Sequence, residues 1–204
     1  DSHKTCSLLL KHLYEDRDLR GEVVKGFAST TLIDKLAEKY SLRLHVTAIG
    51  FKYISDIMLE RNVLIGGEES GGIAVKGRPP ERDGILSSLL LAEMMAYRRQ
   101  GLKSLIGQLD REFGKHHYRR VDLSIGLDKA RQVTALIKSG KLQKIAGIKI
   151  TRTDILDGVK LWLGPSAWIL IRPSGTENLL RLYAEASSKK QLKLMLDKIK
   201  KFVF

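Results

Sequence analysis

The sequence contains a single cysteine, Cys6, among its 204 residues. A disulfide within the chain is therefore excluded, and free thiols are typical of a reducing compartment, so we expect a cytoplasmic protein. Aromatic residues are scarce as well, at 6% of the sequence. They do not form the aromatic-rich strand on which single-stranded nucleic acids stack their bases.

Long hydrophobic runs are also missing. The most apolar run, residues 85–96, is interrupted by Ser87, Ser88 and Glu93, and it is too short and too polar to cross a bilayer. The first residues, Asp-Ser-His-Lys, lack the basic and then apolar layout of a signal peptide. We therefore expect no membrane partner.

Positive charge is the main excess, with a formal net charge of +13 that favours acidic partners such as nucleic acid, anionic lipid or phosphorylated small molecules. Much of it lies in residues 189–201, where apolar residues recur at helical spacing and include Phe202 just beyond. The lysines then lie off the apolar stripe, which indicates a solvated helix face. Nucleic-acid binding would rest on net charge alone, and we expect none. His116 and His117 have no partner at metal-ligand spacing and are interpreted as surface residues.

Residues 1–115 are predicted to form an α/β domain. Helical patterns alternate with short apolar strands, and this alternation favours a mixed, largely parallel sheet with flanking helices. The helices are expected at residues 4–15, 31–39, 49–60, 85–97 and 103–113, and the strands at 21–27, 42–46 and 62–65. Thr31 is predicted to cap the second helix through its side-chain oxygen.

Residues 116–204 are predicted to form a smaller α+β domain. Alternating apolar residues indicate an antiparallel sheet with two helices on one face. The strands are expected at residues 118–124, 148–153, 158–163, 167–171 and 179–186, with helices at 128–138 and after Ser188. Ser188 and Gln191 form a capping-box pattern at the start of the last helix.

Residues 172–178, Arg-Pro-Ser-Gly-Thr-Glu-Asn, join the last two predicted strands. The arginine offers a planar fork that matches phosphate oxygens, the two hydroxyls add neutral donors, and the glycine lets backbone N–H groups turn toward one point. This composition favours a phosphate site. A hairpin connection held by its own Ser and Thr side chains is the alternative.

Residues 66–72, Gly-Gly-Glu-Glu-Ser-Gly-Gly, follow the third predicted strand. Ligands of such sheets bind at the carboxyl ends of the strands. Two carboxylates and one hydroxyl among four glycines suit a polyol, because carboxylates accept hydrogen bonds from sugar hydroxyls. A flexible acidic turn without a ligand is the alternative.

In their order, these two loops resemble those of the α-D-phosphohexomutase family, which includes phosphoglucomutases and phosphomannomutases. Residues 67–71 are similar to the sugar-recognition loop of the family's third domain, and residues 172–177 to the phosphate-binding loop of its fourth. Two further segments match, Gly-Phe-Lys-Tyr-Ile at residues 50–54 and Arg-Asp-Gly-Ile-Leu at residues 82–86. The resemblance spans nearly the whole chain.

The resemblance implies a role for each matching residue. Glu68 and Ser70 would bind the sugar hydroxyls, and the two loops would face a common ligand. Gly50, Lys52 and Arg82 lie in the matching segments, where the two cations suit a phosphorylated ligand or form surface ion pairs instead. The residues that would bind the phosphate are Arg172, Ser174, Gly175, Thr176 and Asn178. Asn178 departs from the proline often found at this place in the family.

Two landmarks of the family are missing. Its first domain carries the transferred phosphoryl group on a serine in a Ser-His-Asn-Pro-like segment, and its second holds Mg²⁺ in an Asp-Gly-Asp-x-Asp-Arg-like loop. Here Ser2 and His3 are followed by Lys4 and Thr5, and no segment clusters three aspartates. The chain therefore resembles the C-terminal half of an enzyme that exchanges phosphoryl groups between hexose positions 1 and 6 through a hexose 1,6-bisphosphate.

The resemblance thus implies hexose phosphates and the N-terminal domains of the same enzyme as partners, with Mg²⁺ and the bisphosphate as cofactors of the complete enzyme. It assigns no catalytic residue and no metal ligand to this chain, and the preferred hexose stays open between glucose and mannose. A non-catalytic module that binds phosphorylated sugars or other anions is the alternative function.

Overall fold

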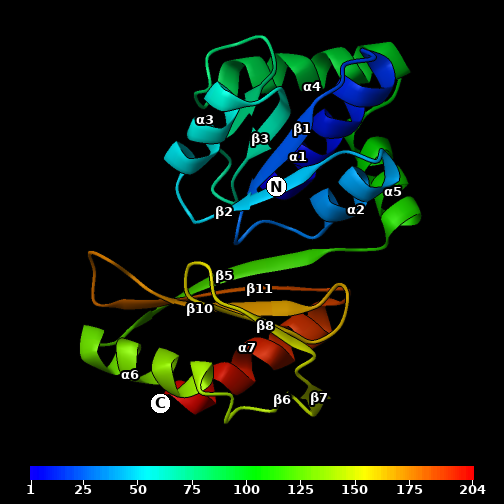
Figure 1. The fold of residues 1–204 in the computed structure, drawn as a ribbon. Coiled ribbons are helices and arrows are strands. Elements are labelled where there is room, and N and C mark those ends of the chain that lie inside the picture. The colour runs from blue at the N-terminus through cyan, green and yellow to red at the C-terminus, as the bar shows by residue number, and fades with distance from the viewer. The chain divides into compact units, whose positions relative to one another are not determined.

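The structure, a computed structural model, describes residues 1–204. The chain forms two compact units, unit 1 (Asp1–Gly114) and unit 2 (Lys115–Phe204) (Figure 1). Each unit has its own sheet and its own hydrophobic core. None of the helices combines the length and the apolar character that crossing a bilayer requires.

Unit 1 alternates helices with short strands. Its elements are α1 (Ser2–Lys11), a π-helical turn η1 (His12–Asp16), β1 (Glu22–Gly26), α2 (Leu32–Lys39), β2 (Leu44–Thr47), α3 (Phe51–Glu60), β3 (Val63–Gly67), β4 (Ile73–Val75), α4 (Gly84–Arg98) and α5 (Leu102–Phe113).

The sheet of unit 1 has the strand order β2-β1-β3-β4. β1 pairs in parallel with both β2 and β3, whereas β4 pairs antiparallel with β3. This mixed, largely parallel sheet confirms the predicted fold class. β4 was not predicted from the sequence, because three apolar residues in a row show no period that separates a strand from a buried turn.

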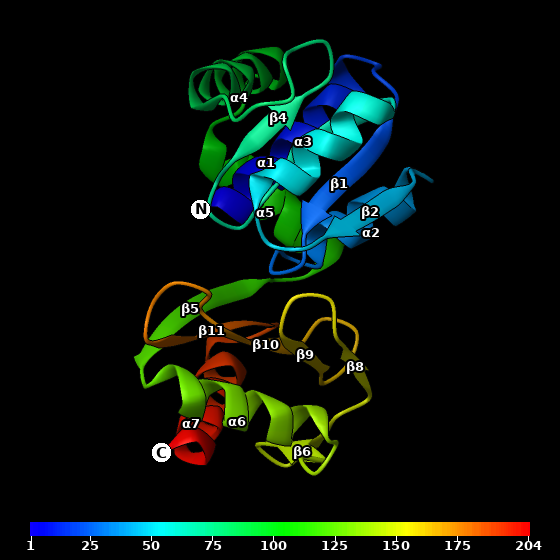
Figure 2. The same cartoon turned by 60° about the vertical axis from the view of Figure 1, so that its left-hand side comes forward.

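Helices cover both faces of this sheet (Figure 2). Successive side chains of a strand point to opposite faces, and Val23 and Val24 of β1 show the division. Val23 joins the core formed with α1, α2, α4 and α5, whereas Val24 packs with Phe51 and Ile54 of α3. The loops that follow the parallel strands β2 and β3 therefore lie at one edge of a rigid layer.

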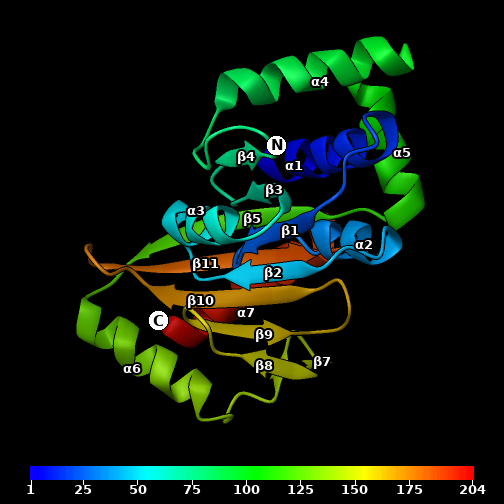
Figure 3. The ribbon, with the colours of Figure 1, turned by 45° about the horizontal axis from the view of Figure 1, so that its top comes forward.

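Unit 2 contains β5 (His117–Ser124), α6 (Leu127–Lys138), β6 (Lys144–Ile145), β7 (Ile148–Lys149), β8 (Arg152–Asp154), β9 (Val159–Trp162), β10 (Trp168–Pro173), β11 (Leu179–Ala186) and α7 (Lys189–Val203). Five strands form an antiparallel sheet in the order β5-β11-β10-β9-β8 (Figure 3). Ile169, Leu180 and Leu182 on one face of this sheet pack against Ile137 of α6 and Met195 of α7. The predicted α+β arrangement with two helices on one face is confirmed.

Several local predictions for unit 2 and for the caps need correction. Residues 148–153 do not form one strand. Ala146 and Gly147 both have positive φ angles, 53° and 81°, and turn the chain into a β6–β7 hairpin before the separate strand β8. Thr31 makes no side-chain cap bond, and instead the Thr30 hydroxyl accepts the Leu32 N–H at 3.1 Å. The Ser188 cap is confirmed, with the Gln191 N–H donating at 3.2 Å.

His116 is not a surface residue. Only 3% of its side chain is exposed, and its Nδ1 lies 3.1 Å from Oε1 of the fully buried Glu185 in β11. Phe202 was predicted on the buried stripe of α7, but it is 38% exposed, and Val203 is buried in its place. The error for His116 comes from its partner Glu185, which lies far from it in sequence.

A network of ion pairs joins η1 to α1, α2, α4 and α5 in unit 1. Glu15 accepts hydrogen bonds from Lys11 at 2.9 Å, Tyr40 at 2.7 Å and Arg98 at 2.8 Å. Burial by itself would raise the pKa of Glu15, but these donors outweigh it and lower the pKa from 4.5 to about 2. The carboxylate therefore stabilises the fold only while it is charged.

Unit 1 is expected to lose stability between about pH 4.5 and pH 2. A carboxyl with a depressed pKa contributes its full stabilisation above the unfolded value and loses it as the pH falls through the folded value. Because the cluster is partly exposed, we expect the Glu15 contribution to be about 1 kcal/mol. The melting temperature of Glu15→Gln should fall less steeply between pH 4.5 and pH 2 than that of the unaltered chain. The control is Glu60→Gln, at the exposed end of α3. If the melting temperatures of both variants depended on pH in the same way, this role of Glu15 would be contradicted.

Cys6 in α1 is expected to be unreactive in the folded protein. Its side chain is buried, and burial raises the pKa of the thiol to about 12, although the nearby Lys25 acts in the opposite direction. The thiolate is the reactive form. Labelling with a chromogenic disulfide at mildly alkaline pH should be at least about a hundredfold slower in native buffer than in denaturant. Equal rates would show that α1 opens readily.

Candidate functional site

The acidic loop begins where β3 ends, at Gly67. The Glu68 N–H donates to the Gly72 carbonyl at 3.0 Å, and the Gly71 N–H donates to the Glu68 carbonyl at 3.1 Å. Gly66 and Gly67 belong to the strand rather than to the loop, so the turn is tighter than its run of glycines predicts. This turn holds Glu68 at the carboxyl edge of the parallel strands.

Three of the predicted sugar-binding residues lie together at this edge. The Ser70 hydroxyl donates to Oε1 of Glu68 at 2.6 Å, and Nη1 of Arg82 lies 3.9 Å from the same oxygen. Glu68 is only 9% exposed, whereas 59% of the Arg82 side chain is exposed. The group thus presents a carboxylate, a hydroxyl and a guanidinium, which suit the hydroxyls and the charge of a phosphorylated sugar.

Gly72 makes room for this group, a role that the sequence did not reveal. A Cβ at this position would lie 2.6 Å from Cδ of Arg82 and 2.7 Å from Oε1 of Glu68. The Asp83 N–H donates to the Ile73 carbonyl at 3.1 Å and thereby fixes Arg82 next to β4. A close approach of two charged side chains therefore explains a glycine that composition marks only as part of a loop.

The segment of residues 50–54 follows β2, at the same edge. Gly50 is the N-cap residue of α3 with a φ angle of 138°. Phe51 is buried and lies under the guanidinium of Arg82, with 5.6 Å from Cζ to the ring centroid. Lys52 instead places its amino group 4.8 Å from the ring centroid of Tyr53. The structure therefore groups Arg82 with Glu68 and Ser70, and it pairs Lys52 with an aromatic ring.

The arginine-led loop lies in unit 2, between β10 and β11. β10 extends through Arg172 and Pro173, which pair with Arg181 and Leu180, so the arginine stands on the sheet rather than in the loop. The Ser174 N–H donates to the Leu179 carbonyl at 2.8 Å and closes the turn. Figure 2 shows the loop projecting beyond the ends of both strands.

Inside this turn, the Ser174 hydroxyl accepts N–H bonds from Glu177 at 3.2 Å and from Thr176 at 3.5 Å. Part of the donor set predicted for a phosphate thus serves the turn itself. Gly175, Thr176 and Asn178 are exposed, and a Cβ at Gly175 would meet nothing within 4 Å. The tip of the loop is therefore open to a ligand, and Ser174 acts first as its internal brace.

Arg172 is held by a carboxylate, Asp157, that was not predicted from the sequence as a site residue. Its Nε lies 2.7 Å from Oδ1 of Asp157, and only about a fifth of each side chain is exposed. Gly158, with a φ angle of 93°, brings the Asp157 turn against β10, since a Cβ there would lie 2.6 Å from the Ile171 carbonyl oxygen. The sequence predicted only that a strand begins at Gly158, and Asp157 lay between two predicted strands.

Comparison with protein families matches both units. Residues 1–113 match the model described as phosphoglucomutase/phosphomannomutase, alpha/beta/alpha domain III. Residues 129–202 match the model of the C-terminal domain of the same family. The chain belongs to the phosphoglucomutase/phosphomannomutase family. The predicted resemblance to the third and fourth domains of this family is confirmed.

Among characterised relatives, this family member is 29% identical over 177 residues to a phosphoglucomutase/phosphomannomutase of Thermococcus kodakarensis, covering 87% of this chain and 36% of the relative. It is 27% identical over 182 residues to a phosphoglucosamine/phosphogalactosamine mutase of Sulfurisphaera tokodaii, covering 89% of this chain and 38% of the relative. The chain thus spans less than half the length of the relatives that it matches.

Solved structures of the family agree. A protein of Thermus thermophilus assigned as a phosphomannomutase is 34% identical, with a TM-score of 0.79 over 98% of this chain and 40% of its own. A phosphoglucomutase of Paramecium, parafusin, is 20% identical, with a TM-score of 0.76 over the same shares of the two chains. The second match supports the fold alone.

Proposed function

We propose that this chain is the sugar- and phosphate-binding half of a phosphohexomutase, an isomerase that interconverts hexose 1-phosphates and hexose 6-phosphates. The observation that carries the proposal is the fixed guanidinium of Arg172, held on β10 by Asp157 at 2.7 Å beside an open loop tip. An arginine whose plane is already set binds a phosphate dianion at little further cost in side-chain entropy.

In this proposal Arg172 and the loop tip bind the phosphate that is not reacting. Charge-assisted hydrogen bonds from the guanidinium, together with Ser174, Gly175, Thr176 and Asn178, hold the remote end of the ligand. The reacting end is then presented in a fixed orientation to the phosphoryl carrier of the complete enzyme. Because the ligand must reorient between two half-reactions, the same loop binds the phosphate at position 1 or at position 6.

Glu68 and Ser70 are proposed to bind the ring hydroxyls of the same ligand, with Arg82 beside them. The Ser70 hydroxyl already donates to Oε1 of Glu68, and the remaining acceptor sites of that carboxylate are proposed to accept from sugar hydroxyls. Contacts to ring hydroxyls can persist in both orientations of the bisphosphate. Lys52 and Gly50 are proposed to line the same edge, next to Tyr53.

Magnesium is expected to act in the complete enzyme. The side chains of this chain do not fit it, since no group of three or more His, Cys, Asp or Glu is placed to hold a metal ion. No metal ligand is assigned here, and the proposed role of this half is limited to binding and orientation.

A calorimetric titration tests the proposal. The 204-residue chain should bind glucose 6-phosphate and mannose 6-phosphate, and free glucose should bind far more weakly because it lacks the dianion. Glucosamine 6-phosphate belongs in the series, since some relatives are phosphoglucosamine mutases. The order of affinities names the preferred hexose, and equal heats for glucose and its phosphates would overturn the role of the arginine-led loop.

A further inference from the structure

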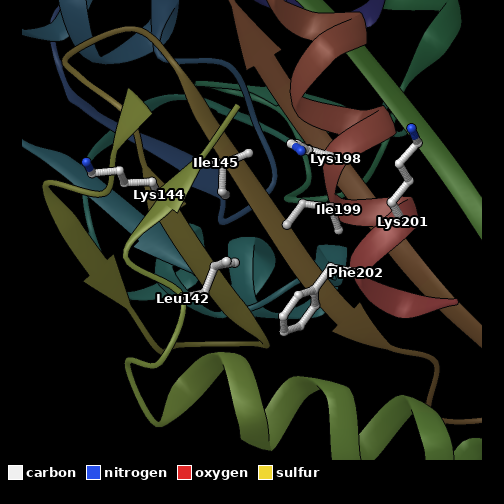
Figure 4. A pocket seen from close by; sticks show the side chains of 7 residues that line it. All are labelled: Leu142, Lys144, Ile145, Lys198, Ile199, Lys201 and Phe202. Atoms are coloured by element: carbon white, nitrogen blue, oxygen red, sulfur yellow. The ribbon is translucent and has the colours of Figure 1, made fainter. Parts of the chain in front are cut away.

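A recess lies between the last helix and a short hairpin strand of unit 2, away from both loops in sequence (Figure 4). Residues 142–145, which include β6, form one side of the recess, and the last turns of α7 form the other. The volume of the recess is about 290 Å³. Figure 4 shows four apolar side chains converging on it: Leu142, Ile145, Ile199 and Phe202. Ile145 and Ile199 form its floor, at 2% and 1% exposure, and belong to the core of unit 2.

Three lysines complete the lining: Lys144, Lys198 and Lys201. All three are exposed, and none makes an ion pair with a carboxylate. No acidic residue lines the recess. Figure 4 shows the amino groups of Lys144 and Lys201 directed away from the four apolar side chains, so their flexible side chains would swing over the recess to meet an occupant.

We propose that this recess binds a small amphipathic anion, a molecule with a short apolar body that ends in a carboxylate or phosphate. The apolar body would be buried against Ile145, Ile199 and Phe202, and the anionic end would meet the lysines. The volume is close to the lower bound of small-molecule sites, about 300 Å³. It suits a free small molecule rather than a peptide helix, which needs an extended groove. None of the lining residues belongs to the phosphosugar loops, so this proposal is independent of the proposed function.

Three probes test the two parts of the recess separately. The 204-residue chain is titrated with octanoate, with 1-octanol, which has the tail without the charge, and with acetate, which has the charge without the tail. Backbone amide shifts in the two-dimensional NMR spectrum report the affinity and the location. Octanoate should bind at least about tenfold more tightly than either control, because each control loses one of the two contributions.

A matched pair of triple variants provides the charge control. Replacing Lys144, Lys198 and Lys201 by glutamine should weaken octanoate binding about tenfold, since three exposed charge interactions together come to about one factor of ten. Replacing Lys189, Lys190 and Lys193, which are exposed on α7 but do not line the recess, changes the net charge equally. This second triple variant should bind octanoate with unchanged affinity.

Phe202→Ala removes part of the apolar wall at a residue that is 38% exposed, so the fold should be retained. It should weaken octanoate binding severalfold, and an unchanged melting temperature verifies the fold. Arg172→Ala should leave octanoate binding unchanged, which separates this site from the phosphosugar loop.

Several results would overturn the proposal. If both triple lysine variants weakened octanoate binding equally, the effect would come from the net charge of the protein and not from the lysines of the recess. Equal binding of 1-octanol and octanoate would leave an apolar cavity without anion selectivity. If the chain bound vesicles of phosphatidylglycerol but its backbone amide signals did not shift on adding octanoate, the recess would be part of a membrane-binding surface and not a small-molecule site.

Discussion

The 204-residue chain by itself is expected to convert no glucose 1-phosphate into glucose 6-phosphate. Phosphoryl exchange needs a group that carries the phosphoryl between the two positions, and the chain has neither the serine segment nor the aspartate-rich segment of its family. Uncatalysed reactions of phosphate monoesters are among the slowest known, so binding alone gives no measurable turnover. A coupled assay that oxidises glucose 6-phosphate and follows NADPH measures this directly.

The assay needs a positive and a negative control. A complete enzyme that carries this half should be active under the same conditions. Arg172→Ala in the 204-residue chain, purified in parallel, detects contaminating mutase from the expression host. Turnover that scales with the concentration of the unaltered chain and disappears in the variant would show that this half has a catalytic group of its own.

Arg172→Ala in a complete enzyme is expected to weaken hexose phosphate binding at least about tenfold. Hydrogen bonds that involve a charged group contribute roughly 1.5–3 kcal/mol each, and 1.4 kcal/mol corresponds to a factor of ten. The loss should appear in the dissociation constant from calorimetry and in kcat/KM alike.

Arg152→Ala is the matched control for this change. Arg152 is an arginine of the same unit that also pairs with a carboxylate, with 3.0 Å from its Nη2 to Oδ2 of Asp154, but it lies on the edge strand β8. Its loss should leave affinity unchanged. Asp157→Ala should raise the dissociation constant by less than Arg172→Ala, because the guanidinium survives and loses only its fixed orientation. Affinity that is unaffected by Arg172→Ala would remove the phosphate role of this loop.

The sequence predicted the layers of both units well, because these depend on local apolar patterns. Val23 and Val24, flanked by helical segments, are sufficient to indicate a buried parallel strand. The alternation of Leu180, Leu182 and Ala184 is sufficient to indicate an antiparallel strand with one covered face. Four motifs in order were sufficient to indicate the family, since each motif had to fall at the end of a predicted strand or at the start of a predicted helix.

The remaining features depend on pairs of residues that are distant in sequence. His116 is buried because Glu185 lies 69 positions away on the neighbouring strand, and no local pattern contains that information. Asp157 and Arg172 pair only after β9 and β10 have aligned, so the positioning carboxylate was invisible beside an ordinary turn. The β6–β7 hairpin was missed because strands of two residues are too short to show alternation.

The placement of Arg172 inside β10, with an exposed tip following it, has a consequence for how this protein diversifies. The backbone of Arg172 is fixed by pairing with β11, and its guanidinium is held by Asp157, so its direction should not change when the tip residues are substituted. Under the proposed function, substitutions at Gly175, Thr176 and Asn178 would therefore change the neutral contacts to the phosphate and leave the guanidinium in place. We therefore expect Arg172, at the end of β10, to change more slowly in evolution than the tip residues Gly175, Thr176 and Asn178.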